Sequence, residues 1–245
     1  MVLGGNREFR IYPQSFGLCS GGTGPALTRK GLIVFAREPL PGRVKTRLAA
    51  AIGDQAAVEL YRAMLRDVLD LSRRLTDVET VIYWDCEEKS LPRLEQIYRC
   101  GSRRQIPGDL GQRMQAAFEE MFADGFESCC IIGSDTPDLP HAYILDAFEL
   151  LEDRRFDAVL GPSADGGYYL LGLKRLYPQL FHGIDWSTSH VFRQSLAAAG
   201  SAGAVAGLLP EWYDIDTPED LDAFIKRSGR FSGNGCDTAT LATAL

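Results

Sequence analysis

Aspartates that follow apolar, strand-like runs are the first residues of this sequence that suggest chemistry. Asp135 comes shortly after the run 129–132, where a carboxylate can hold Mg²⁺ or Mn²⁺ against substrate phosphates, because hard cations prefer oxygen ligands. Asp214 and Asp216 would share one face of an extended segment, so Asp216 is a second candidate metal ligand if that segment lies beside Asp135. The alternative role for these aspartates is capping of the helices that follow.

A basic segment, residues 37–47, follows the first apolar run. It holds four cations and one anion and precedes a helical pattern, which suits the binding of phosphates by arginine forks and a lysine point charge. It is not a Walker A loop, because Val44 stands where that motif requires glycine. The alternative is a solvated loop that makes surface ion pairs. The phosphate-binding candidates are Arg37, Gly42, Arg43, Lys45 and Arg47.

Two weaker signals lie further along the chain. In the glycine-rich stretch 161–169, Asp165 can accept hydrogen bonds from hydroxyl groups, and Gly166 and Gly167 can bring backbone N–H groups close to a ligand. The same stretch is also a good plain turn between two strands. Gln105 has both a donor and an acceptor with which to contact a base edge, although by itself it indicates only a loop before a helix.

The elements that must position these residues alternate between strand and helix patterns from about 31 to 227. This alternation is typical of βαβ units and predicts one three-layer α/β/α domain with a mostly parallel central sheet. Ligands bind such sheets at the carboxyl ends of the strands, where the segments above stand. Predicted strands cover 32–36, 78–84, 129–132, 158–160 and 168–173, and predicted helices lie at 54–75, 91–98, 110–122, 143–151, 191–199 and 218–226.

Composition limits the classes of protein to consider. The chain has 245 residues with 26 Lys+Arg against 33 Asp+Glu, a net charge of −7, which disfavours a general nucleic-acid or anionic-membrane binder. No apolar run is long enough to span a bilayer. The beginning lacks the pattern of a secretory signal, so we expect a cytoplasmic protein. Residues 1–30 and 228–245 are rich in small residues and predict poorly anchored ends.

The six cysteines show no zinc-ligand spacing. We expect buried, reduced thiols, with the adjacent Cys129 and Cys130 on opposite faces of a strand.

Taken in order, these motifs resemble those of the nucleotide-diphospho-sugar transferase superfamily, which has the glycosyltransferase-A fold, and more narrowly a bacterial glycosyltransferase-like branch of it. The resemblance covers about 31–225. It rests on the segments 35–48, 108–114, 132–139, 161–169 and 214–221.

The resemblance implies roles for individual residues. The basic segment would hold the nucleotide phosphates, with Asp135 at the metal position and Asp216 as a candidate second ligand, and we take Lys45 and Asp135 as the catalytic candidates. Gln105 and Gly108 would lie near the base. The acceptor or sugar would face Asp165, Gly166, Gly167 and Tyr168.

We therefore expect a transferase that depends on Mg²⁺ or Mn²⁺, binds a nucleotide or nucleotide sugar together with a small acceptor, and acts by positioning and electrostatics. Glycosyl transfer is favoured. Nucleotidyl transfer from a nucleoside triphosphate to a phosphate-bearing molecule, with release of pyrophosphate, stays open, because Asp135 and Asp138 are spaced Asp-x-x-Asp rather than Asp-x-Asp. A non-catalytic nucleotide-binding module is a third possibility, and its mark would be loss of the carboxylates or cations.

Overall fold

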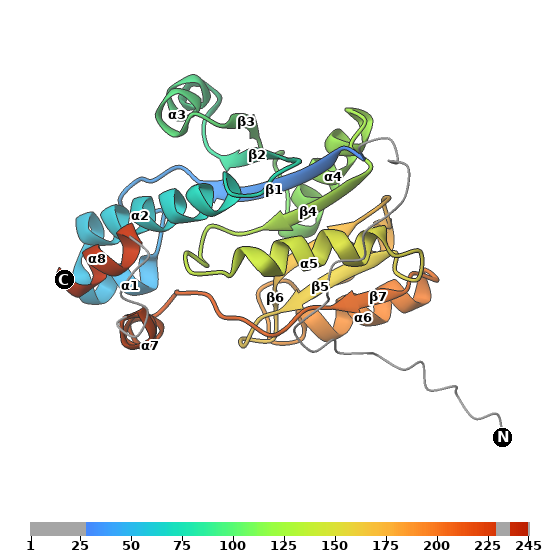
Figure 1. Ribbon diagram of the computed structural model, residues 1–245. Helices are drawn as coiled ribbons and strands as arrows, with labels where there is room; N and C mark the ends of the chain where they lie inside the picture. The colour runs from blue at the N-terminus through green and yellow to red at the C-terminus, as the bar shows by residue number, and fades with distance from the viewer. Residues whose placement is uncertain (1–27, 229–235, 245) are drawn as a thin grey trace.

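The computed structural model describes residues 28–228 and 236–244. At its centre is one seven-stranded sheet of order β3-β2-β1-β4-β6-β5-β7 (Figure 1). The strands are β1 (Lys30–Arg37), β2 (Val78–Asp85), β3 (Gly101–Arg104), β4 (Ser128–Ile132), β5 (Ala158–Pro162), β6 (Tyr168–Leu173) and β7 (Ala206–Leu208). Helices cover both faces of the sheet, so the expected three-layer α/β/α fold is confirmed.

The middle of the sheet contains its topological switch point. β1 pairs in parallel with β2 on one side and with β4 on the other, so the chain winds away from β1 in both directions. Leu32, Ile33 and Val34 are fully buried, as expected for a strand covered on both faces. In such sheets the crevice for ligands opens where the order reverses, at the carboxyl ends of the two strands.

Strand β6 is the antiparallel member of the sheet and pairs with both β4 and β5. Because β6 runs opposite to β4, it begins at the edge where β4 ends. The turn 163–167, which joins β5 to β6, therefore lies at the same edge as the loop after β4. This geometry brings a late segment of the chain to the crevice.

The helices pack on the sheet through two apolar clusters, one on each face. Residues of α2 and α5 contact one face, and residues of α4 and α6 contact the other. Cys130 belongs to the first cluster and Cys129 to the second, so their predicted opposite orientation is confirmed. The helices are α1 (Thr46–Ile52), α2 (Asp54–Ser72), α3 (Leu91–Tyr98), α4 (Leu110–Ala123), α5 (His141–Glu152), α6 (Val191–Ser201), α7 (Pro218–Ser228) and α8 (Asp237–Ala244).

A third cluster joins α1, α2, α7 and α8 beside the sheet. Helix α8 lies in the stretch that the sequence indicated as a poorly anchored end, yet it packs against α2. Asp67 of α2 accepts hydrogen bonds from the backbone N–H and the hydroxyl of Thr238, and Thr238 is fully buried. The expectation for the first residues of the chain lies outside the described residues, except for 28–30.

Two other features differ from the expectations or extend them. The edge strand β3, with the sequence Gly-Ser-Arg-Arg, was not predicted because it has no apolar alternation. Cys86, Cys100 and Cys236 are half-buried rather than buried. In the described ranges, no helix is both long and apolar enough to cross a membrane.

Candidate functional site

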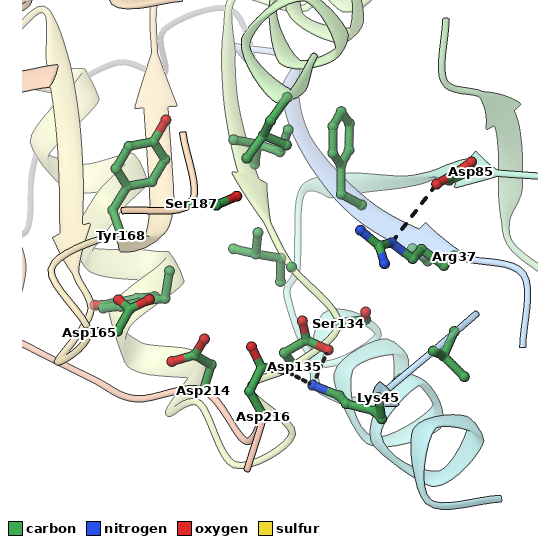
Figure 2. A pocket seen from close by; sticks show the side chains of 18 of the residues that line it. Arg37, Lys45, Asp85, Ser134, Asp135, Asp165, Tyr168, Ser187, Asp214 and Asp216 are labelled. Atoms are coloured by element: carbon green, nitrogen blue, oxygen red, sulfur yellow. Dashed lines mark hydrogen bonds and ion pairs between the residues drawn. The ribbon is translucent and has the colours of Figure 1, made fainter. Parts of the chain in front are cut away.

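A cavity of about 680 Å³ opens at the carboxyl edge of the sheet, at the ends of β1, β2 and β4. It brings together predicted residues from separate segments: Arg37, Lys45, Arg47, Gln105, Asp135, Asp165, Tyr168 and Asp216. Figure 2 shows Asp165, Asp214, Asp216 and Asp135 in a row that leads to Lys45, with Arg37 and Asp85 across the opening. Gly42, Arg43, Gly108 and Gly166 are not among the lining residues, and Gly167 lines only a smaller chamber beside the cavity.

Lys45 lies between the two predicted metal ligands (Figure 2). Its Nζ is 2.7 Å from Asp135 Oδ1 and 2.8 Å from Asp216 Oδ1, and it donates a third hydrogen bond of 2.6 Å to the carbonyl of Ile215. Burial disfavours the ammonium, but the two carboxylates outweigh burial and raise the pKa of Lys45. The three N–H groups of Lys45 are thus matched by three protein oxygens, and phosphate binding by Lys45 would require one of them to be released.

Backbone pairing explains why Asp214 and Asp216 reach Asp135. The N–H of Ile215 donates to the carbonyl of Asp135 at 3.0 Å, and Ile215 itself is fully buried in the third apolar cluster. The neighbours on either side of Ile215 therefore both line the cavity. This placement satisfies the condition on which Asp216 was proposed as a second ligand.

The surroundings of Asp214 disfavour its ionised form. Burial, followed by the charges of Asp165, Asp216 and Asp135, raises the pKa of Asp214 to about 6. Its Oδ1 accepts a hydrogen bond of 3.2 Å from the hydroxyl of Ser163. A cation placed among these carboxylates would stabilise the ionised form.

The opposite wall of the cavity is basic. Arg37 and Arg113 line it together with Asp85, and Arg47 lines the cavity as well. Asp85 Oδ2 is 3.9 Å from Arg37 Nε and 3.6 Å from Arg113 Nη1, so one carboxylate orients two guanidinium groups without neutralising both. Arg43 approaches the same carboxylate at 3.9 Å, from outside the lining.

Tyr61 of α2 links the basic segment to the loop that carries Asp135. Its hydroxyl accepts hydrogen bonds from the backbone N–H of Arg37 at 2.8 Å and from the hydroxyl of Ser134 at 3.0 Å. Tyr61 and Ser134 are both buried. One side chain therefore sets the spacing between the ends of β1 and β4.

Gln105 lines the cavity, but its amide is already in use. Its Nε2 donates to the carbonyl of Tyr83 at 2.8 Å, and its Oε1 accepts from Arg113 Nη1 at 3.2 Å. Gln105 therefore holds Arg113 in place in this structure.

The capping alternatives can be judged directly. Helix α5 has Pro140 at its N-cap and no side-chain cap, so Asp135 is not a capping residue, and Asp138 instead accepts a hydrogen bond from the hydroxyl of Tyr213. At α7 the hydroxyl of Thr217 accepts from the N–H of Asp220. The carboxylate of Asp216 is thereby left to face Lys45.

Three elements of the cavity were missed from the sequence. Asp85 directly follows a predicted strand, so the rule that singled out Asp135 would have found it. Arg113 stands one residue before Met114 in a segment already noted, but it was not assigned a role. The loop 187–189 had no signal, because it reaches the cavity only through tertiary packing in which Phe192 N–H donates to the carbonyl of Gly166.

The site residues can be tested for their fit to a divalent metal ion. Among the residues that the structure describes, no group of three or more His, Cys, Asp or Glu side chains is arranged to hold a metal. The chemistry nevertheless fits, since the donors are carboxylate oxygens and the side chains of Asp135, Asp165, Asp214 and Asp216 line one cavity. Mg²⁺ commonly takes one or two carboxylates, with substrate phosphates completing its ligands. Asp135 and Asp216 would be those carboxylates, each through an oxygen that Lys45 leaves free.

Comparisons with known proteins agree with this architecture. A bacterial family described as "Uncharacterized protein conserved in bacteria (DUF2064)" matches residues 68–188. A protein of Desulfovibrio desulfuricans G20, provisionally assigned as a nucleotide-diphospho-sugar transferase, is 31% identical with a TM-score of 0.83, over 89% of this chain and 95% of that one. No curated protein matches the sequence.

More distant structures share the fold alone. The 4-diphosphocytidyl-2C-methyl-D-erythritol synthase of Anaerococcus prevotii DSM 20548 is 12% identical with a TM-score of 0.56, over 82% of this chain and 97% of that one. Glucosyl-3-phosphoglycerate synthase of Mycobacterium tuberculosis, solved with Mn²⁺ and uridine diphosphate, is 9% identical with a TM-score of 0.50, over 82% of this chain and 76% of that one. With the close match to the Desulfovibrio protein, the fold and the strand-end motifs show that the chain belongs to the nucleotide-diphospho-sugar transferase superfamily, a superfamily of transferases.

Proposed function

We propose that this protein transfers a glycosyl group from a nucleotide sugar to a small acceptor. The observation that carries the proposal is one cavity of about 680 Å³ with arginines on one wall and carboxylates on the other. Arg37, Arg47 and Arg113 would bind the diphosphate, because guanidinium groups pair with phosphate oxygens in fork geometry. The Mycobacterium enzyme, solved with Mn²⁺ and uridine diphosphate, is an example of this fold holding such a metal and diphosphate.

In this mechanism the protein acts mainly by orientation and electrostatics. A divalent ion held by Asp135 and Asp216 would supply charge neutralisation for the leaving diphosphate. Lys45 fixes the positions of both carboxylates through its ion pairs, and Tyr61 fixes the distance between the basic segment and the Asp135 loop. The arginines hold the diphosphate so that the sugar points toward Asp165 and Asp214.

A binding panel followed by product analysis tests the proposal. Thermal shifts would be measured with nucleoside triphosphates and with UDP-, GDP-, ADP- and dTDP-sugars, each with and without Mn²⁺; a ligand at about 100 times its dissociation constant stabilises by roughly 2.7 kcal/mol. A shift with a nucleotide sugar and release of nucleoside diphosphate are expected. A shift confined to triphosphates, with release of pyrophosphate, would instead establish nucleotidyl transfer, and no nucleotide shift at all would refute both.

A further inference from the structure

A second, smaller chamber of about 210 Å³ continues from the main cavity toward the turn 163–167. Asp135, Asp165, Tyr168 and Asp214 line both spaces, so the chamber opens beside the carboxylates and away from the arginines. Figure 2 shows Asp165, Tyr168 and Ser187 on this side. A molecule in the chamber would therefore lie next to the sugar of a bound donor.

The lining of the chamber suits a ligand that carries hydroxyl groups. Asp165 and Asp214 offer carboxylate acceptors, Ser187 offers a hydroxyl group, and Trp186 contributes an aromatic side chain. Such amphipathic lining, with few polar groups among apolar surface, is typical of small-molecule sites.

The charge of the chamber is one-sided. Three aspartates line it, and no lysine, arginine or histidine from the described part of the chain does so. Asp216 and Lys45 line the adjoining main cavity, and with them the group has four carboxylates and one ammonium. A bound divalent cation would reduce its net charge from −3 to −1. A phosphate ester placed here would meet net repulsion, whereas an amine would be attracted.

We propose that this chamber is the acceptor subsite and that it selects a hydroxyl-bearing acceptor that is neutral or positively charged and carries no phosphate. The inference rests on the proposed glycosyl transfer and names the acceptor class for it. Asp165 and Asp214 exclude anionic molecules and accept hydrogen bonds from the hydroxyl groups of the acceptor. The donor phosphates bind at the arginine wall.

Matched sets of acceptors test this assignment. The probes are glycerol, serinol and glycerol 3-phosphate, and D-glucose, D-glucosamine and glucose 6-phosphate, each measured by thermal shift and by nucleoside diphosphate release above donor hydrolysis. We expect the alcohol or the amine of at least one set to exceed its phosphate ester by at least about tenfold in affinity or turnover, since like-charge contacts cost several kcal/mol. Equal or better use of the phosphate esters, or no response to any alcohol or amine while the donor binds, would overturn the proposal.

Variants separate the charge of the chamber from other effects. Replacing both acids, Asp165→Asn with Asp214→Asn, should bring the preference over the phosphate ester down to about threefold or less, because both amides keep a hydrogen-bond acceptor but lose the charge. Asp222→Asn, on the exposed side of α7, removes a distant charge and should leave the preference unchanged. If the double variant fails to fold, the single change at the exposed Asp165 is used and should lower the preference at least about threefold. An unaltered preference in a folded variant would contradict the proposal.

The two proposals fail in different ways. If no nucleotide sugar binds but alcohols or amines still stabilise the protein through Asp165 and Asp214, the proposed glycosyl transfer is wrong, while the selectivity of the chamber for neutral or cationic hydroxyl compounds holds. If the donor binds and is hydrolysed while phosphate esters are preferred, the chamber assignment is wrong and the donor stands.

Discussion

Lys45 and Asp135 form an ion pair of 2.7 Å in which the lysine side chain is 3% exposed and the aspartate side chain 38% exposed. The ammonium is therefore held by the protein, while the carboxylate still faces the cavity. Lys45 also occupies the left-handed region with φ of 48° at the N-cap of α1, a conformation that is uncommon for a residue other than glycine. Both observations indicate that Lys45 is held in place, where it positions the carboxylates of Asp135 and Asp216.

Replacing Lys45 by methionine should destabilise the protein by about 2 kcal/mol. Loss of one partner of a fully buried pair costs about 3–5 kcal/mol, and the effect is smaller here because Asp135 and Asp216 are partly solvated. Urea unfolding at pH 7 measures the change. Lys89→Met is the matched control, since the Lys89 side chain is 84% exposed, and its stability should equal that of the wild type. Equal stability of both variants would show that the buried ammonium is dispensable.

Asp135→Asn should lower metal-dependent turnover by about 10²–10³-fold, or roughly 2.7–4 kcal/mol of barrier, the range for removing a preorganised electrostatic group. The variant should still fold, because Lys45 keeps Asp216 and the carbonyl of Ile215 as partners. Steady-state kinetics over a Mn²⁺ titration provide the measurement. A folded variant with the metal-dependent turnover of the wild type would remove Asp135 from the mechanism.

Asp214→Asn should change the pH dependence of stability. The folded-state pKa of Asp214, about 6, lies above its ordinary value of 3.8, so the wild type loses stability as pH rises from about 4 through 6. The full shift would correspond to about 3 kcal/mol, and solvent screening of this partly exposed group reduces it to about 1 kcal/mol. The stability of the variant relative to the wild type should therefore rise from about pH 4 to about pH 7. Unfolding free energies that run parallel across this range would show that the pKa is not raised.

Arg37 and Arg43 form a matched pair for testing the basic wall. Both guanidinium groups approach Asp85 at 3.9 Å, but only Arg37 lines the cavity. Arg37→Gln should weaken nucleotide binding by about 1.5–3 kcal/mol, the range for a hydrogen bond to a charged group, whereas Arg43→Gln should have little effect. Calorimetry with the nucleotide that binds best makes the comparison. A larger loss for Arg43 would restore the role that the sequence suggested for it.

Tyr61→Phe should cost about 1–3 kcal/mol of stability, because the backbone N–H of Arg37 and the hydroxyl of Ser134 lose a buried acceptor. It should also lower kcat, since the ends of β1 and β4 lose their common contact. Tyr98→Phe is the control, because no hydrogen bond to the Tyr98 hydroxyl occurs within the described residues. Unfolding curves and kinetics that match for the two variants would argue against a positioning role for Tyr61.

The local parts of this site could be predicted from the sequence because their signals are local. The strand before Arg37 is a continuous apolar run, residues 32–36. Asp135 stands out because a carboxylate so soon after a buried strand is hard to explain by packing alone.

What the sequence did not show depends on contacts between distant segments. Lys45 was expected to bind phosphate, and its three protein partners are visible only once the 214–216 segment pairs with Asp135. The loop 187–189 carries no local pattern, and the edge strand β3 is polar and short. Helix α8 was not predicted because its small residues form only a weak apolar face. Asp67 of α2, which accepts hydrogen bonds from Thr238 of α8, is distant in the sequence.

The separation of arginines and aspartates onto facing walls gives the cavity an electric dipole. A nucleotide sugar carries its charge at the diphosphate, so the field would turn the approaching molecule phosphate-first toward Arg37 and Arg113 before any contact forms. The same field would retard a molecule that arrives the other way round. Its reach is about one Debye length, about 8 Å at physiological ionic strength, and added salt should therefore slow association more than it speeds release.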